Sequence, residues 1–252
     1  MSDLYNTLTT AANHHPYLYH YTNLRALKCI LSNKSLRLSR LDKVNDSQEN
    51  KRITSLWNSK LYVLCFTYDL NNQEYFFQNY GKIRLTFNKD AINFDNIYSD
   101  SELTKTFASG TRTNFNYHSY SSESDWCVYD KTLADVFYTN KMNEHIAEDG
   151  FESNAGLIKF KKGLDNKNEC RNWEQERETR LRIAFRPIGP ENMMCGNRIV
   201  QPIPPFEHVF LEMPHIKTIT ISPQIPTPKI QEIYECLAQH NLLSICDSYQ
   251  SL

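Results

Sequence analysis

The order of apolar and polar residues along the chain predicts several short strands. Residues 61–68 are apolar at successive positions, which is typical of a central strand buried on both faces. Residues 36–39 and 82–88 instead alternate apolar and polar side chains, which predicts strands with one buried face. Two further strands are expected at 157–161 and 216–222.

Helical periodicity is clearest near the two ends of the chain. Apolar residues recur every three or four positions within residues 22–32, and Thr22 or Asn23 is the expected N-cap. The last helix is expected to begin at Thr227, with Pro228 in its first turn. Residues 126–148 are also expected to be helical.

Strands in the middle flanked by helices favour an α+β fold. We expect one domain over residues 1–252, because 252 residues suffice for a single large core. Residues 99–124 are rich in Ser, Thr and Asn, and we expect a variable insertion at about 99–150.

Charge and glycine content exclude some classes of function. The net charge is −1 and glycine occurs only seven times, while tyrosine and phenylalanine are plentiful. No global field therefore recruits nucleic acid, and glycine-rich phosphate loops of the Rossmann or Walker type are absent from the sequence.

The seven cysteines are scattered and form no C-x-x-C pair, which favours a reducing, cytoplasmic location and argues against a zinc knuckle. Neither a signal sequence nor an apolar run of membrane-spanning length is apparent. We therefore expect a cytoplasmic protein with no membrane partner and no metal.

The segment Trp173-Glu174-Gln175-Glu176-Arg177-Glu178-Thr179-Arg180 carries the strongest chemical pattern. A strand is expected over 178–185. A period of two through this segment sends apolar residues to one face and four charged residues to the other: Glu176, Glu178, Arg180 and Arg182. The polar face is either solvated, with weak ion pairs, or part of a site in which adjacent carboxylates have shifted pKa values.

Three earlier segments offer groups for the same site. His20 precedes the first helix beside Thr22, and both are expected to line a cleft, although a lone histidine more often bonds to backbone. Arg37 and Arg40 can hold a pyrophosphate or remain solvated. The aromatic cluster at residues 75–80, with Tyr75 and Phe76, is either a stacking wall or core.

These segments, in this order, resemble a large, mostly bacterial family of uncharacterised proteins related to the ADP-ribosyltransferase superfamily. The matching motifs are His20-Tyr21-Thr22, Leu36-Arg37-Leu38-Ser39, Asn45-Asp46-Ser47-Gln48-Glu49, Cys65-Phe66, the aromatic segment ending at Gly81, and Trp173 to Arg180. They lie within residues 18–87 and 157–245. The resemblance implies a mostly antiparallel, split β-sheet core flanked by helices.

The resemblance also implies a site for NAD as a substrate. It implies that His20 binds the adenosine ribose hydroxyls, that Tyr75 or Phe76 forms the nicotinamide wall, and that Glu178 or Glu176 is the catalytic acidic side chain. The catalytic set is then Glu178, Glu176 and His20. The NAD-binding set is His20, Tyr21, Thr22, Arg37, Arg40, Tyr75, Phe76 and Arg180.

The expected function is therefore NAD-dependent ADP-ribosyl transfer to a protein or nucleic acid, or NAD hydrolysis. Such an activity suits a toxin, an effector or a phage-defence protein, with an antitoxin or immunity protein as a candidate partner. Two alternatives stay open. One is a non-catalytic module that binds a nucleotide or nucleic acid, and the other is an RNA-processing phosphotransferase that uses His20 among basic residues.

Overall fold

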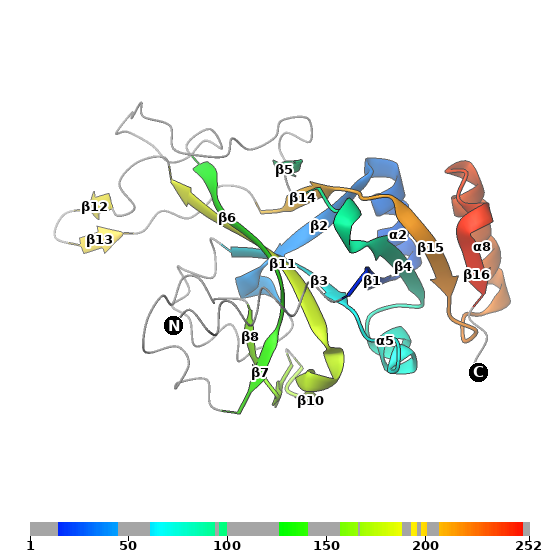
Figure 1. The fold of residues 1–252 in the computed structure, drawn as a ribbon, viewed down its shortest axis with the longest axis horizontal. Coiled ribbons are helices and arrows are strands. Elements are labelled where there is room, and N and C mark those ends of the chain that lie inside the picture. Colours follow the sequence, from blue (N-terminus) through cyan, green and yellow to red (C-terminus); the bar gives the residue numbers. More distant parts are fainter. Residues whose placement is uncertain are drawn as a thin grey trace.

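A mixed, mostly antiparallel β-sheet organises the described part of the chain (Figure 1). The structure is a computed structural model and describes residues 15–44, 61–93, 96–99, 126–140, 157–165, 167–187, 193–195, 198–200 and 207–248. Ten strands of these residues form the sheet: β1 (Tyr17–Thr22), β2 (Ser35–Arg40), β3 (Leu61–Thr67), β4 (Ile83–Asn88), β5 (Ile97–Ser99), β6 (Trp126–Asp135), β11 (Glu178–Pro187), β14 (Val209–Glu212), β15 (Ile216–Ile221) and β16 (Cys246–Ser248).

The main path of the sheet runs β16-β15-β4-β1-β3-β2-β14-β5. Strand β11 pairs with the other edge of β3, and β6 continues from β11. Within this sheet, the described pairs are antiparallel except for β15 with β16. Strand β3 thus has neighbours on both edges and is buried on both faces, as the sequence predicts.

Shorter strands lie outside the main sheet. They form three two-stranded pairs: β7 (Phe137–Thr139) with β8 (Ile158–Phe160), β9 (Lys162–Leu164) with β10 (Cys170–Asn172), and β12 (Met193–Cys195) with β13 (Arg198–Val200). The 3-10 turn η5 (Trp173–Glu176) then leads from β10 into β11.

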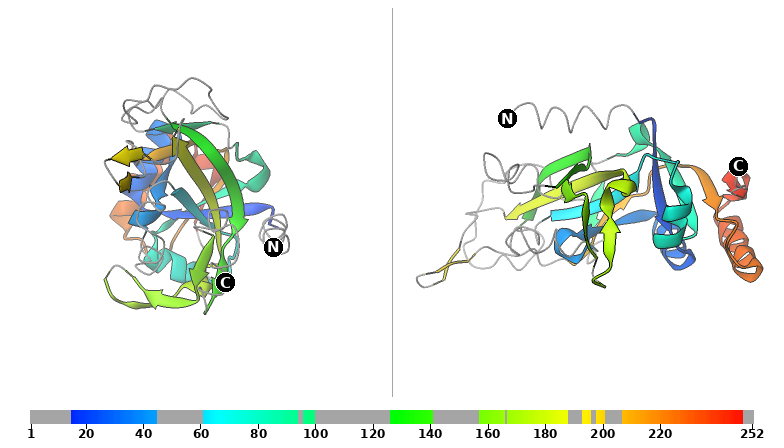
Figure 2. Two further views of the ribbon diagram at one scale, coloured as in Figure 1. Left: turned by 90° about the vertical axis from the view of Figure 1, so that its left-hand side faces the viewer. Right: turned by 90° about the horizontal axis from the view of Figure 1, so that it is seen from below.

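Three α-helices occur in the described residues: α2 (Leu24–Asn33), α5 (Gln73–Asn79) and α8 (Thr227–Gln239). The buried faces of α2 and α8 join the main hydrophobic core against one face of the sheet. Helix α8 lies at the opposite end of the molecule from the β12–β13 hairpin (Figures 1 and 2). A membrane-spanning helix is not found among the described residues.

Helix α2 follows directly from its sequence signals. The Asn23 side chain caps it by accepting a hydrogen bond from the Ala26 backbone N–H at 2.9 Å. Leu27, Ile30 and Leu31 form its buried stripe. The helix ends where Lys34 adopts the left-handed conformation at φ 49°.

Helix α5 packs on the opposite side of β1 through aromatic residues. Phe76 and Phe77 bury against Tyr21, whose side chain lies on the face of β1 away from the main core. Gly81 then returns the chain to β4 with φ 138°, and a Cβ atom there would lie 2.2 Å from the Thr22 carbonyl oxygen. Glycine is therefore required where the aromatic segment ends.

One edge of β3 is shared between two strands that diverge. Tyr19 of β1 pairs with Thr67 at one end, while Ser39 and Arg40 of β2 pair with the other end of β3. Between these positions, residues 64–66 of β3 have no described β-bridge partner on this edge. The gap between β1 and β2 at this edge is where the candidate site lies.

The predicted α+β class is confirmed, as are the expected strands at 61–68, 82–88, 157–161 and 216–222. The expected helix at 126–148 is wrong over its described part, because residues 126–135 form β6 and residues 137–139 form β7. The reason is tertiary pairing. This segment hydrogen-bonds along the length of β11, and that ladder outweighs a local helical pattern.

The segment expected as an insertion therefore contributes a strand to the main sheet. Figure 2 shows β6 and β11 as a long, curved pair. The Asn45-to-Glu49 motif and residues 100–125 lie outside the described residues.

Candidate functional site

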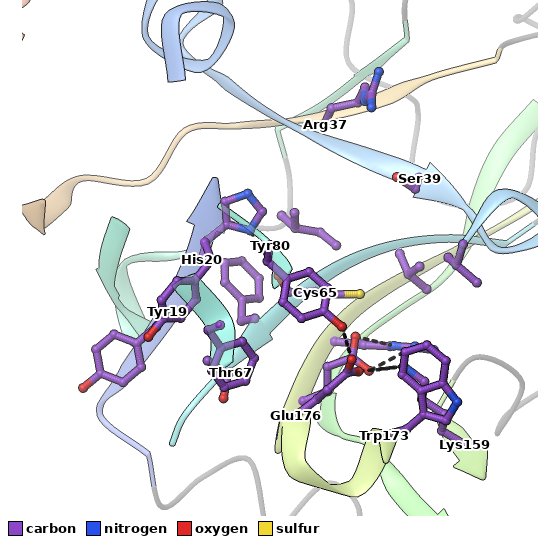
Figure 3. Close-up of a pocket in the computed structure, with 18 of the residues that line it drawn as sticks. Tyr19, His20, Arg37, Ser39, Cys65, Thr67, Tyr80, Lys159, Trp173 and Glu176 are labelled. Carbon is purple, nitrogen blue, oxygen red and sulfur yellow. Dashed lines mark hydrogen bonds and ion pairs between the residues drawn. The ribbon is translucent and has the colours of Figure 1, made fainter. Parts of the chain in front are cut away.

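A pocket of about 310 Å³ opens in the gap between β1 and β2, with β3 as its floor and η5 and β11 on its far side (Figure 3). Seven predicted site residues line this pocket. They are His20, Tyr21, Arg37, Phe76, Glu176, Glu178 and Arg180. Segments more than 150 residues apart in sequence thus contribute to one cavity.

Three predicted site residues do not line the pocket. Thr22 is buried one step beyond it, where β1 pairs with β4. Arg40 turns to Asp42 and makes a two-pronged ion pair with it, at 3.1 and 2.7 Å. Tyr75 packs edge-on against the lining residue Phe76, with ring centroids 5.5 Å apart.

His20 bridges the gap at which β1 and β3 diverge. Its Nδ1 lies 3.1 Å from the Cys65 carbonyl oxygen. Burial lowers the pKa of His20, although the hydrogen bond to Cys65 opposes this effect. A neutral imidazole that donates from Nδ1 leaves Nε2 as a hydrogen-bond acceptor.

Glu178 is a buried carboxylate that stays ionised. Arg180 donates to both of its oxygens, at 3.2 and 3.1 Å, and the Lys159 Nζ lies 3.3 Å away. Burial by itself would raise the pKa of Glu178, but the charges of Arg180 and Lys159 and a hydrogen bond from Cys65 outweigh it and lower the pKa to about 2. Burial and the nearby Glu178 charge also raise the Cys65 pKa well above its usual value, so Cys65 remains a thiol.

Glu176 reaches the same pocket from a turn and not from a strand, so its predicted strand position is wrong. It ends η5, and Arg177 in the left-handed conformation, at φ 42°, turns the chain into β11. Lys159 donates to Glu176 at 2.8 Å, and the Tyr80 hydroxyl donates to its other oxygen. Glu176 and Glu178 are only 2% and 7% exposed as whole residues, so they do not form a solvated face.

Lys159 is the main residue that sequence reasoning missed. It lies on β8 and is 4% exposed, and its Nζ is 4.2 Å from the centre of the Trp173 ring while it bridges both carboxylates. The available signal was a lone lysine between Ile158 and Phe160 in a short apolar strand. A buried lysine requires compensating charge.

The aromatic cluster is mostly core. Tyr21 and Phe76 stack on each other, with ring centroids 4.9 Å apart, and Phe77 packs edge-on against Tyr21. Phe76 and Phe77 are almost fully buried, whereas Tyr80 lines the pocket and is 39% exposed. The accessible aromatic surface therefore belongs to Tyr80 and the half-buried Tyr19 more than to Tyr75.

The described lining carries more basic than acidic side chains. Glu176 and Glu178 are already neutralised inside the pocket, while Arg37 and Lys43 are exposed residues of its lining from β2 and the turn after it. This arrangement favours a ligand with an anionic part near Arg37 and Lys43. The described residues hold no group of three or more His, Cys, Asp and Glu side chains suited to a metal ion.

Comparison with known proteins does not extend these observations. No family model, no curated protein and no solved structure matches the chain.

Proposed function

We propose that the chain is an NAD-dependent ADP-ribosyltransferase with a protein or nucleic acid as its acceptor. The observation that carries the proposal is the presence of His20 and Glu178 in the lining of one pocket. A polyhydroxylated ligand with an anionic part and a cationic leaving group suits an imidazole acceptor, an ionised carboxylate and exposed basic residues. NAD combines these features.

The size of the pocket suggests which parts of a bound NAD molecule lie inside it and which lie outside. A cavity of about 310 Å³ is at the lower end of the roughly 300–1,000 Å³ typical of ligand sites. We place the nicotinamide ribose inside it and the pyrophosphate at Arg37 and Lys43, which are exposed. His20 Nε2 accepts a hydrogen bond from a ribose hydroxyl in this arrangement.

Glu178 is assigned to the bond-breaking step. Cleavage of the bond between the ribose and nicotinamide passes through an oxocarbenium-like state, and the bonding electron pair leaves with the nicotinamide nitrogen. The Glu178 carboxylate accepts a hydrogen bond from the ribose and stabilises the developing positive charge. Losing a preorganised contact of this type costs about 100–1,000-fold in rate.

The contacts of Glu178 limit how a ribose hydroxyl binds to it. Arg180, Lys159 and Cys65 together supply four donors, which matches the roughly four acceptor sites of a carboxylate. A thiol is the weakest of these donors. The incoming hydroxyl therefore replaces the Cys65 thiol, while Arg180 and Lys159 keep the carboxylate ionised.

Glu176 is assigned to the acceptor. Its carboxylate already accepts a hydrogen bond from the hydroxyl of Tyr80. An acceptor group that approaches Glu176 in the same way transfers its proton to the carboxylate as it bonds to the ribose.

A binding-only function is the second candidate, and the saturation of Glu178 with donors favours it. Calorimetry and nicotinamide release, measured on the same purified protein with NAD, separate the two functions. Binding of NAD accompanied by nicotinamide release supports the transferase, and binding of NAD without release supports the binding-only function. Incubation with labelled NAD and cell lysate then identifies the acceptor class, and unchanged turnover in Glu178→Ala removes the catalytic assignment.

A further inference from the structure

Tyr80 is an exposed nucleophile held against one of the two pocket carboxylates. It follows the last turn of α5, lines the pocket and is 39% exposed. Its hydroxyl donates a hydrogen bond to Glu176, and Figure 3 shows the phenol ring extending across the pocket toward that carboxylate. A hydroxyl bonded to a carboxylate is the arrangement that a general base requires.

The Tyr80 hydroxyl is also close to the group assigned to the ribose. The Lys159 Nζ lies 2.8 Å from the Glu176 Oε2 and 3.3 Å from the Glu178 Oε2, so the two carboxylates are neighbours on either side of one ammonium group. The phenol oxygen bonds directly to the first of them. A ribose held at Glu178 therefore has the Tyr80 hydroxyl as a neighbour.

Four other nucleophilic groups of the described lining are less suitable. Lys159 is committed to two ion pairs, and Cys65 is a thiol that bonds to the weakly basic Glu178. The Thr67 hydroxyl donates to the backbone carbonyl of Arg177 at 3.2 Å. Ser39 lies on β2, on the other side of the pocket from Glu176 (Figure 3).

We propose that Tyr80 is an automodification site, which accepts the ADP-ribosyl group from NAD bound in the pocket of the same chain. This inference rests on the proposed function. The bond between the ribose C1′ and the nicotinamide nitrogen breaks, and its electron pair leaves with nicotinamide. A new bond forms between the Tyr80 oxygen and C1′, and the phenolic proton passes to the Glu176 carboxylate.

The structure offers a matched control on helix α5, which Tyr80 follows. Tyr75 also forms a hydrogen bond with Glu176 but does not line the pocket. Tyr80→Phe and Tyr75→Phe each keep an aromatic ring and remove one hydroxyl bonded to the same carboxylate. A loss of adduct caused by disturbing Glu176 affects both variants, whereas a loss of the acceptor oxygen affects only Tyr80→Phe.

The test is intact-mass and peptide mass spectrometry of the purified full-length chain after incubation with NAD, with released nicotinamide measured in parallel. We expect an adduct on Tyr80 in the chain without substitutions and in Tyr75→Phe. In Tyr80→Phe, we expect the adduct per nicotinamide released to fall about tenfold or more. The adduct should form at a rate per chain that does not depend on protein concentration, since transfer occurs within one chain.

Four outcomes overturn the inference and leave the proposed function intact. The amount of adduct per nicotinamide released is unchanged in Tyr80→Phe, or it falls equally in Tyr80→Phe and Tyr75→Phe. Alternatively, the rate of adduct formation per chain rises with protein concentration, or nicotinamide is released while the chain carries no adduct. An absence of nicotinamide release removes the proposed function and this inference together.

Discussion

The Nδ1 of His20 lies 3.1 Å from the backbone carbonyl oxygen of Cys65. The side chain of Cys65 in turn bonds to Glu178. One residue of β3 thus connects the imidazole from the beginning of the chain to the carboxylate on β11. The relative position of the two groups depends on this strand.

We predict that His20→Ala lowers kcat/KM for nicotinamide release from NAD by about tenfold, the equivalent of one hydrogen bond of about 1.4 kcal/mol. Because burial lowers the His20 pKa, the unaltered protein should keep its kcat/KM as the pH falls from 8 to the ordinary imidazole value of 6.5. His240→Gln is the control, since His240 lies beyond α8 and outside the pocket lining. An inflection at pH 6.5 that is absent from His20→Ala contradicts the assignment of a neutral imidazole.

Substitutions at Cys65 should change the KM for NAD in opposite directions. Cys65→Ala removes a donor from Glu178 and frees an acceptor site for the ribose hydroxyl, so KM should fall. Cys65→Ser supplies a stronger donor that competes with the ribose, so KM should rise. Steady-state kinetics of nicotinamide release measures both, and a lower KM in Cys65→Ser contradicts the proposed displacement of the thiol.

Lys159→Met should destabilise the protein by about 3–5 kcal/mol, because it leaves two buried carboxylates short of a counter-ion. Lys161→Met is the matched control on the same segment. Lys161 pairs with Glu174 at 2.8 Å, but both side chains are more than a third exposed, and exposed pairs contribute roughly 0–1 kcal/mol. Urea unfolding at pH 7 compares the two variants, and equal losses of stability rule out a buried charge network around Lys159.

Much of the sheet follows from local pattern, while the site depends on pairings that no local pattern contains. Strands such as β3 and β4 are recognisable because apolar runs and alternation reflect burial directly. Glycine at 81 and asparagine at 23 also act through neighbouring residues, which a sequence displays.

The errors share one cause. The local pattern of residues 126–148 predicts a helix because it does not show the pairing of this segment with β11. The alternation through Glu176 predicts a strand because it does not show the left-handed conformation of Arg177. The solvated alternative for Glu178 and Arg180 fails because β8 brings Lys159 over them from an unrelated segment. Charge alone does not indicate burial, since the compensating group lies elsewhere in the chain.

Glu178 should make the stability of the protein depend on pH at the acid end. Its pKa is lowered from 4.5 to about 2 on folding, so its contribution is fully present above pH 4.5 and is lost as the pH falls toward 2. A pKa shift of this size corresponds to about 3 kcal/mol of free energy of unfolding. Acid unfolding followed by circular dichroism should therefore show a shallower pH dependence between 4.5 and 2 for Glu178→Gln, and an unaltered profile contradicts the ionised, charge-paired state.

The central claim is that Glu178 acts chemically on NAD inside this pocket. The most direct test is the rate of nicotinamide release from NAD by the purified chain, compared with Glu178→Gln and with Glu174→Gln. Glu174 belongs to the same acidic segment but pairs with Lys161 outside the pocket lining. We predict that Glu178→Gln lowers the rate about 100-fold or more while Glu174→Gln retains it. Equal rates in the two variants, with both shown to be folded, contradict the claim.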